Sequence, residues 1–288
     1  AGRALPCPPW VPFVTGEYTM LFHRIVLRTA NAIFNLIVIC LLLVGGAYSA
    51  FALWDNERVY SAAGDVQADM IKIKPEIVLS EDTEEEGADF SELLAINEDV
   101  CAWVTMDGTN IDLPVVQGET NLTYINTDVY GQFSLPGSIF LDSRNKRDFS
   151  ETYSLLYGHN MADHQMFGDL QLYKDKKFFD ENTTGILITP DKAFQLEIIA
   201  CMLVESNDHY IFEPTNWKHY NTKNLYKYIE ENSMYFHGDK LEELKEMNQR
   251  EVQILTLSTC SNEYTDARTI VLTHMIPYGA GELGGQEE

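Results

Sequence analysis

Three residue types that can together carry out acyl transfer lie in or beside apolar segments of this chain. Cys260 ends the run 253–260 (QILTLSTC), and Arg268 follows within 265–272 (TDARTIVL). His159 comes about a hundred residues earlier, after an apolar run and a glycine that we expect to form a turn. A thiolate can attack an amide carbonyl, a histidine can exchange the proton, and a guanidinium can stabilise the oxyanion. This combination predicts a cysteine enzyme.

The elements that must position these residues are predicted to be mostly strands. Residues 102–106 and 111–116 flank the turn sequence DGTN, which predicts a hairpin. Further strands are expected at 137–141, 153–157, 185–189, 194–205, 251–259 and 269–275. Helices are expected at 92–95, 121–125 and 166–173, with a longer helical pattern at 224–248. About eight short strands with few long helices predict a mainly β domain that forms a closed barrel or a sandwich.

A second decisive feature is the uncharged apolar run 32–54, which has the ~20 residues that a membrane helix needs. Arg24 and Arg28 precede it, and Asp55 and Glu57 follow, so the positive-inside rule predicts a cytoplasmic N-terminus and an extracytoplasmic remainder. A cleaved signal peptide is the alternative, because small residues occur at 47–50. The run is longer than the ~7–15 residues of a signal-peptide core, which favours a retained anchor.

These features divide the chain into five predicted segments. Met20 is predicted to be the natural start, so residues 1–19 carry no weight in the fold argument. The segments are a cytoplasmic part at 1–31, a membrane helix at 32–54, an extracytoplasmic helix and acidic linker at 55–89, a catalytic domain at 90–277 and a tail at 278–288.

Charge and cysteine content limit the partners. The net charge of −24 argues against nucleic acid and anionic lipid head groups, because both need a basic surface. Outside the N-terminal segment and the membrane run lie Cys101, Cys201 and Cys260, an odd number that cannot all pair within the chain. We expect the first two to be buried core thiols. No cysteine and histidine spacing is typical of a zinc site, so neither a metal nor another cofactor is predicted.

Several motifs together resemble the class B sortases. They begin with NEDVCAWV at 97–104, DGTNID at 107–112 and PVVQ at 114–117. GSIFLD at 137–142, YGHNM at 157–161, MFG at 166–168 and TLSTC at 256–260 follow in the family's order. Sortases are membrane-anchored cysteine transpeptidases of Gram-positive bacteria. The resemblance implies a closed eight-stranded β-barrel with peripheral helices, and the helical pattern before the cysteine strand is similar to the insertion that marks class B.

The resemblance also implies a role for each candidate catalytic residue. Sortases cut a sorting signal after its threonine, hold the acyl group as a thioester and release it to an amine. Cys260 would be the nucleophile, His159 the acid and base, and Arg268 the oxyanion stabiliser. His164 is the nearest rival to His159 but lacks the Tyr-Gly-His-Asn context.

Substrate-binding residues are implied by position in the family. Tyr157, Ser258, Tyr210 and Ile211 correspond to groove residues, and Asn121 and Ile125 correspond to the opposite wall. Ordinary core positions are the alternative for the aromatic and aliphatic residues among them. Some class B members carry an acidic residue shortly after the cysteine, whereas this chain has Ser-Asn-Glu at 261–263. The resemblance therefore carries no prediction for recognition by this segment, and the departure does not affect the three catalytic candidates.

The predicted function is transfer of a secreted surface protein or pilin to an amine of the cell wall or of a pilin lysine. Wall anchoring and pilus polymerisation are not separated by the sequence. An exported cysteine hydrolase, in which water resolves the acyl-enzyme, is the alternative enzyme. A membrane-tethered binding domain with an inert Cys260 is the non-enzymatic alternative, which rapid alkylation of the thiol would exclude.

Overall fold

The computed structural model describes residues 15–78, 87–161, 164–260 and 267–278, and it divides the chain into two compact units, residues 1–57 and 58–288. The acidic run at 80–89 lies mostly outside the described residues, as do nearly all of the segments 1–19, 261–263 and 278–288. Each unit is described by itself below.

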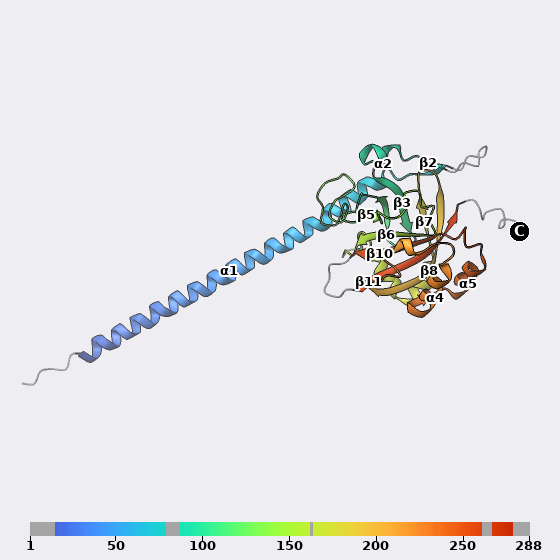
Figure 1. Ribbon diagram of the computed structural model, residues 1–288. Coiled ribbons are helices and arrows are strands. Elements are labelled where there is room, and N and C mark those ends of the chain that lie inside the picture. The colour runs from blue at the N-terminus through green and yellow to red at the C-terminus, as the bar shows by residue number, and fades with distance from the viewer. Residues whose placement is uncertain (1–14, 79–86, 162–163, 261–266, 279–288) are drawn as a thin grey trace, which may run out of the picture. The chain divides into compact units, whose positions relative to one another are not determined.

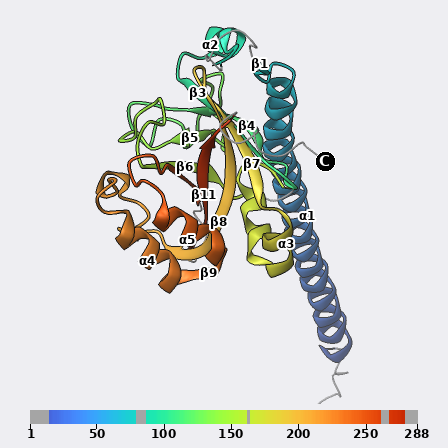
Figure 2. The same cartoon turned by 90° about the vertical axis from the view of Figure 1, so that its right-hand side faces the viewer.

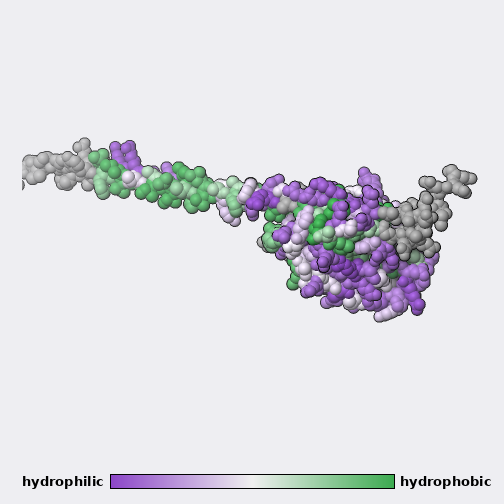
Figure 3. Space-filling model, turned by 90° about the horizontal axis from the view of Figure 1, so that it is seen from above, coloured by the Kyte–Doolittle hydropathy of each residue, from purple (hydrophilic) through white to green (hydrophobic). Residues whose placement is uncertain are grey.

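The first unit consists of most of one long helix, α1 (Thr15–Ile71). Its apolar stretch is long enough to cross a membrane, and none of it is buried by other parts of the protein. The space-filling view shows this stretch as a nearly continuous hydrophobic surface (Figure 3). The predicted apolar helix is therefore present. It ends shortly before Pro75, as expected from the missing amide hydrogen of proline.

The second unit is built on a barrel. Its strands are β3 (Val100–Met106), β4 (Asp112–Val116), β5 (Ile139–Leu141), β6 (Tyr153–His159), β7 (Thr184–Ile188), β8 (Ala193–Glu205), β10 (Ile254–Cys260) and β11 (Ala267–Pro277). Among the described residues these eight pair in the order β11-β10-β6-β5-β4-β3-β7-β8, and β8 pairs again with β11. That last pairing closes the sheet, so the predicted closed eight-stranded barrel is confirmed (Figure 1).

The remaining elements lie around this barrel. They are β1 (Ile77–Val78), β2 (Gly87–Ala88), α2 (Ser91–Ile96), α3 (Lys176–Glu181), α4 (Thr222–Asn232), β9 (Ser233–Phe236), α5 (Gly238–Glu246) and the 3₁₀ helices η1 (Gly168–Lys174) and η2 (Pro214–Asn216). The helical pattern expected over 224–248 is interrupted by β9, which pairs with the edge of β8. Figure 2 shows α4 and α5 side by side, next to β8 and β11.

Two apolar layers fix the faces of the strands that matter for function. Leu156, Leu255, Leu257 and Val271 belong to the cluster that fills the barrel. Alternate residues on the same strands, such as Ile254, belong to a second cluster that also contains residues of α4 and α5. Because side chains alternate along a strand, odd positions of β10 face the barrel interior and even positions face the second layer.

The end of α1 that belongs to the second unit packs on the barrel domain. Met70 is buried in a third cluster with Trp103 of β3. The side-chain amide of Gln67 donates to the carbonyl of Asn110 at 2.8 Å, and the ammonium of Lys74 lies 2.7 Å from a carboxylate oxygen of Asp112. The helix that follows the apolar stretch is thus bound to the domain by both apolar and polar contacts.

Candidate active site

Three neighbouring strands bring the predicted catalytic residues into one row. β6 and β10 are parallel, and their register pairs His159 with Cys260. β10 and β11 are antiparallel, and their register runs to Ser258 opposite Ile270. Continued for two more residues, the same register would bring Cys260 opposite Arg268. Residues paired across a sheet share a face. The side chain of Cys260 lies outside the described part of the structure.

His159 is held at the end of β6 by a turn far away in the sequence. Its ring nitrogen Nε2 lies 2.7 Å from the backbone carbonyl oxygen of Ile125, and the side chain is half-buried. Because a carbonyl oxygen only accepts hydrogen bonds, Nε2 is the donor in this arrangement. Gly137 leaves space for this carbonyl, because a Cβ at residue 137 would come within 2.4 Å of the same Ile125 oxygen, and its own φ of 61° also favours glycine.

Gly158 has a different role from the turn expected from the sequence. It lies inside β6, between Tyr157 and His159, and has no positive φ. A Cβ there would come within 2.4 Å of the Cδ1 atom of Ile139 and 2.7 Å of the ring of Phe167. Glycine at this position therefore provides room for two buried side chains beneath the strand that carries His159.

Arg268 is the second residue of β11 and is half-buried. It pairs with Val204 of β8, and the amide of its neighbour Thr269 donates to the Oγ1 atom of Thr259 at 3.2 Å. The backbone that carries the Arg268 side chain is therefore held between β8 and β10. His164, the rival histidine, instead pairs with the buried carboxylate of Asp169.

The other two cysteines of the domain are unsuited to chemistry at neutral pH. Cys101 and Cys201 are both buried, at 1% and 0% exposure, as expected for core thiols. Burial raises the pKa of each thiol to about 12. A thiolate is therefore not accessible at either position.

The structure places Tyr157 and Ser258 in the row next to the catalytic candidates, since the two residues are register partners on β6 and β10. Ser258 is fully buried. The Tyr157 ring is half-buried between Phe140, at a centroid distance of 5.2 Å, and Phe212, at 6.3 Å. Burial and the nearby charge of Asp142 both raise the pKa of Tyr157, so its hydroxyl stays a hydrogen-bond donor.

Asn121 and Ile125 lie on a turn rather than on the short helix expected from the sequence. The hydroxyl of Thr123 lies 3.3 Å from the amide of Thr120, and such local side-chain bonds compete with helical ones. The Asn121 side chain accepts from the amide of Ser143 at 2.7 Å and donates to a carboxylate oxygen of Asp142 at 2.9 Å. Its described contacts are therefore within the scaffold.

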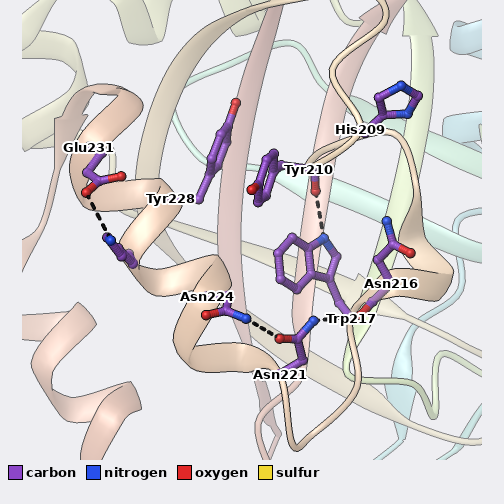
Figure 4. Close-up of a pocket in the computed structure, with 9 residues that line it drawn as sticks. His209, Tyr210, Asn216, Trp217, Asn221, Asn224, Tyr228 and Glu231 are labelled. Atoms are coloured by element: carbon purple, nitrogen blue, oxygen red, sulfur yellow. Dashed lines mark hydrogen bonds and ion pairs between the residues drawn. The ribbon is translucent and has the colours of Figure 1, made fainter.

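Tyr210 and Ile211 differ in exposure. Ile211 is completely buried in the second apolar cluster, whereas Tyr210 is half-exposed. Tyr210 lies in an open cavity of about 650 Å³, whose lining is drawn in Figure 4: His209, Tyr210, Asn216, Trp217, Asn221, Asn224, Lys227, Tyr228 and Glu231. Its ring stacks on Tyr228 at 4.5 Å, and its carbonyl accepts from the indole of Trp217 at 2.7 Å. The aromatic residues of this cavity thus hold Tyr210 in place.

One residue with a central place in this region was missed by sequence reasoning. Asp142, the last residue of the motif GSIFLD, is completely buried and binds Asn121, Tyr157 and Arg144. Burial alone would raise its pKa, but the hydrogen bonds from Arg144, Asn121 and Tyr157 outweigh burial and keep the pKa below its usual range. A carboxylate that ends an apolar strand, with an arginine two positions later, was the available signal.

Comparison with known proteins agrees with this architecture. A class B sortase of Streptococcus pyogenes that is involved in pilus biogenesis is 39% identical, covering 65% of this chain and 97% of its own, with a TM-score of 0.57. A Bacillus anthracis protein similar to sortase B is 27% identical, covering 78% of this chain and 97% of its own, with a TM-score of 0.61. Sortase B of Listeria monocytogenes is 28% identical over 243 residues, which cover 82% of this chain and 93% of that protein. No family model matches the chain.

The closed eight-stranded barrel matches solved structures of the sortase type of enzyme. Given the 39% identity over nearly the whole chain of the streptococcal crystal structure, this chain belongs to the class B sortases, which are cysteine transpeptidases.

Proposed function

We propose that Cys260, His159 and Arg268 are the catalytic residues of this transpeptidase. The observation that carries the proposal is their shared row on β6, β10 and β11, in which Cys260 is the register partner of His159. The Cys260 thiolate attacks the backbone carbonyl carbon of the threonine in a sorting signal, and a C–S bond forms. The oxyanion of the tetrahedral intermediate is stabilised by the Arg268 guanidinium, which stays charged at every working pH.

The contacts of His159 indicate which of its ring nitrogens exchanges the proton. With Nε2 donating to the Ile125 carbonyl, proton exchange with the reacting groups takes place at Nδ1. Protonated His159 gives this proton to the departing amine as the C–N bond breaks, which leaves a thioester. In the second half-reaction neutral His159 takes a proton from the incoming amine, whose attack on the thioester restores an amide and releases the thiolate.

The substrate is proposed to be a secreted surface protein or pilin with a C-terminal sorting signal. Tyr157, Ser258, Tyr210 and Ile211 on one side, and Asn121 and Ile125 on the other, are the proposed contacts. The acceptor is an amine of the cell wall or a pilin lysine. Support for including a lysine acceptor comes from the streptococcal relative, which is involved in pilus biogenesis.

The enzyme is proposed to be a single-pass membrane protein with residues 32–54 in the bilayer. The charge asymmetry around this run supports a cytoplasmic N-terminus and an extracellular catalytic domain at 90–277. The uncovered apolar surface of α1 supports the membrane location.

The decisive experiment is mass spectrometry of the full chain in detergent micelles. The protein is incubated with sorting-signal peptides of the Leu-Pro-x-Thr-Gly and Asn-Pro-x-Thr types, with and without a glycine or lysine amine. We expect an acyl adduct on Cys260 that transfers to the amine, and no adduct on the Cys260→Ala variant. A Cys101→Ala variant, which removes a buried thiol of the same domain, is the matched control and should form the adduct.

Three results would contradict the proposal. Release of carboxylate alone, unaffected by the amine, would identify the exported hydrolase instead. An active Cys260→Ala protein would remove the nucleophile from the mechanism. No adduct with any peptide, combined with a Cys260 thiol inert to alkylation, would leave a binding domain as the better description.

A further inference from the structure

We propose that Asp142 is a positioning residue for recognition of the sorting signal, because it fixes residues from both sides of the substrate groove at one buried carboxylate. The inference rests on the proposed function. It assigns Asp142 no contact with the reacting atoms.

The carboxylate of Asp142 binds donors from three segments. Its Oδ1 atom accepts from the backbone amide of Arg144 at 2.9 Å and from the Nε atom of Arg144 at 2.8 Å. Its Oδ2 atom accepts from the other side of the guanidinium at 2.7 Å, from the Asn121 amide at 2.9 Å and from the Tyr157 hydroxyl at 2.9 Å. An ionised carboxylate has about four lone-pair sites, so both oxygens are saturated.

The same network reaches the segment that carries Tyr210. A guanidinium nitrogen of Arg144 donates to a carboxylate oxygen of Glu213 at 2.7 Å, and another donates to the carbonyl of Phe212 at 2.7 Å. Phe212 in turn stacks on the Tyr157 ring with an angle of 12° between the planes. Arg144 is therefore clamped between Asp142 and the segment 212–213, two residues beyond Tyr210.

The chemistry of this network favours positioning over stability. Removing a carboxylate and an arginine from water is costly, and a well-packed apolar group is often equally stable in their place. A bidentate pair, however, fixes the relative orientation of the segments that carry it. Here it fixes Asn121, Tyr157 and the segment 212–213, which come from three parts of the chain.

The catalytic row has separate support, so loss of Asp142 should affect substrate binding more than the chemical step. The Ile125 carbonyl that holds His159 lies in a turn fixed from the other side, where the Ser138 amide donates to the carbonyl of Tyr124 at 3.1 Å. Cys260 is held by its pairing with His159 of β6, and its strand β10 pairs with β11 up to Ser258. In the part of the chain that the structure describes, the hydrogen bonds of the Asp142 carboxylate go to Asn121, Arg144 and Tyr157 and not to these residues.

The test is steady-state kinetics of Asp142→Asn in the full chain, in detergent and with saturating amine. The variant keeps the shape but turns one acceptor oxygen into a donor that faces other donors. Hydrogen bonds to charged groups are worth enough for about a ten- to hundredfold effect, so we expect KM for the signal peptide to rise by that factor. We expect kcat and the alkylation rate of Cys260 to stay within about threefold of wild type, since a factor of three is under 1 kcal/mol.

Asp112→Asn is the matched control. Asp112 also accepts three side-chain hydrogen bonds, from Lys74, Trp103 and Thr105, but it lies at the start of β4 and none of these partners belongs to the groove. The control loses the same charge and should keep the wild-type KM. A rise in KM for both variants would indicate a general loss of domain integrity and overturn the proposal.

If Asp142→Asn does not fold, a milder variant tests the positioning role of Asp142. Tyr157→Phe removes only the hydroxyl bond to Asp142 and retains the ring between Phe140 and Phe212. Tyr157→Phe should raise KM by a smaller factor. If Asp142→Asn folds, the effects of the two substitutions on the free energy of substrate binding should be less than additive in the double variant.

Other results separate the failure of this inference from the failure of the proposed function. An unchanged KM in Asp142→Asn and Tyr157→Phe, or a fall in kcat at constant KM, would overturn the positioning role alone. If no sorting-signal peptide forms an acyl adduct with the wild-type protein, both the positioning role and the proposed function are refuted.

Discussion

Replacing Gly158 with alanine should displace His159 without touching any polar group of the site. Gly158 immediately precedes His159 in β6, and its missing side chain leaves room for Ile139 and Phe167. A Cβ at this position would lie 2.4 Å from Ile139 and 2.7 Å from the Phe167 ring. Both neighbours are almost completely buried, at 1% and 0% exposure, so neither can move into solvent.

The size of the effect follows from these contacts. Carbon atoms pack at ~3.5–4.0 Å, so the new methyl group must push strand β6 and its neighbours apart by about 1 Å. Adding a methyl group to a packed core typically costs about 1–3 kcal/mol. For a domain of this size each kcal/mol lowers Tm by roughly 2–4 °C. Misplacing a catalytic group by about 1 Å can cost ~10²-fold in rate, so kcat should fall by about that factor.

The assay combines thermal unfolding with single-turnover acylation. Gly238→Ala is the matched control, because a Cβ there would lie 3.7 Å from Phe236, an ordinary contact, and it should leave kcat unchanged. Phe167→Leu, which shortens the ring under Gly158, should restore part of the kcat of Gly158→Ala. A Gly158→Ala protein with wild-type Tm and kcat would refute the reasoning.

Three further results are expected. Arg268→Lys should lower kcat by ~10²–10³-fold with a small change in KM, measured by steady-state kinetics, because an ammonium lacks the fixed fork of donors. At pH 8 an alkylating reagent should modify Cys260 rapidly and Cys101 only on unfolding, measured by peptide mapping, because burial raises the pKa of Cys101 to about 12. Burial lowers the pKa of His274 below its unfolded value near 6.5. Its contribution to stability is therefore full above that pH and declines as the pH falls below it. Tm should fall between about pH 7.5 and pH 5, and it should fall less steeply in His274→Gln.

Most of the barrel could be predicted from the sequence, because its strands are short apolar runs separated by turn residues. The hairpin around Gly108 formed as expected, with β3 and β4 antiparallel and Gly108 at a φ of 72°. The order of strands could not be read in the same way. Closure depends on the pairing of β8 with β11, and pairing partners this far apart leave no local signature.

The helical pattern at 224–248 shows how tertiary pairing overrides a local preference. Residues 233–236 interrupt it as β9, whose backbone pairs with Ala200, Cys201 and Met202 of β8. An exposed strand edge has unpaired amide and carbonyl groups, and pairing with β9 satisfies them. Local periodicity contains no information about that edge, so a helix was the reasonable prediction from the sequence alone.

In the candidate site, too, local sequence indicates some residues, whereas the role of others depends on the fold. Cys260, His159 and Arg268 could be proposed because their residue types and flanking motifs indicate chemistry. For Asp142 the sequence offered only a carboxylate at a strand end with an arginine two positions later, because its other partners are brought together by the fold from residues 121 and 157. The glycine before His159 was assigned to a turn because its actual function, space for Phe167, depends on a residue of another segment.

The parallel pairing of β6 and β10 explains why the candidate catalytic residues His159 and Cys260 lie at the same end of the barrel. Two parallel neighbours end on the same rim, so a residue that ends each strand is delivered to the same place whatever lies between them. The chain between them builds β7, β8 and the α4–α5 insertion, and Arg268 is the second residue of the return strand β11. The loops that leave the rim can then vary for substrate recognition while the barrel keeps the three residues in register.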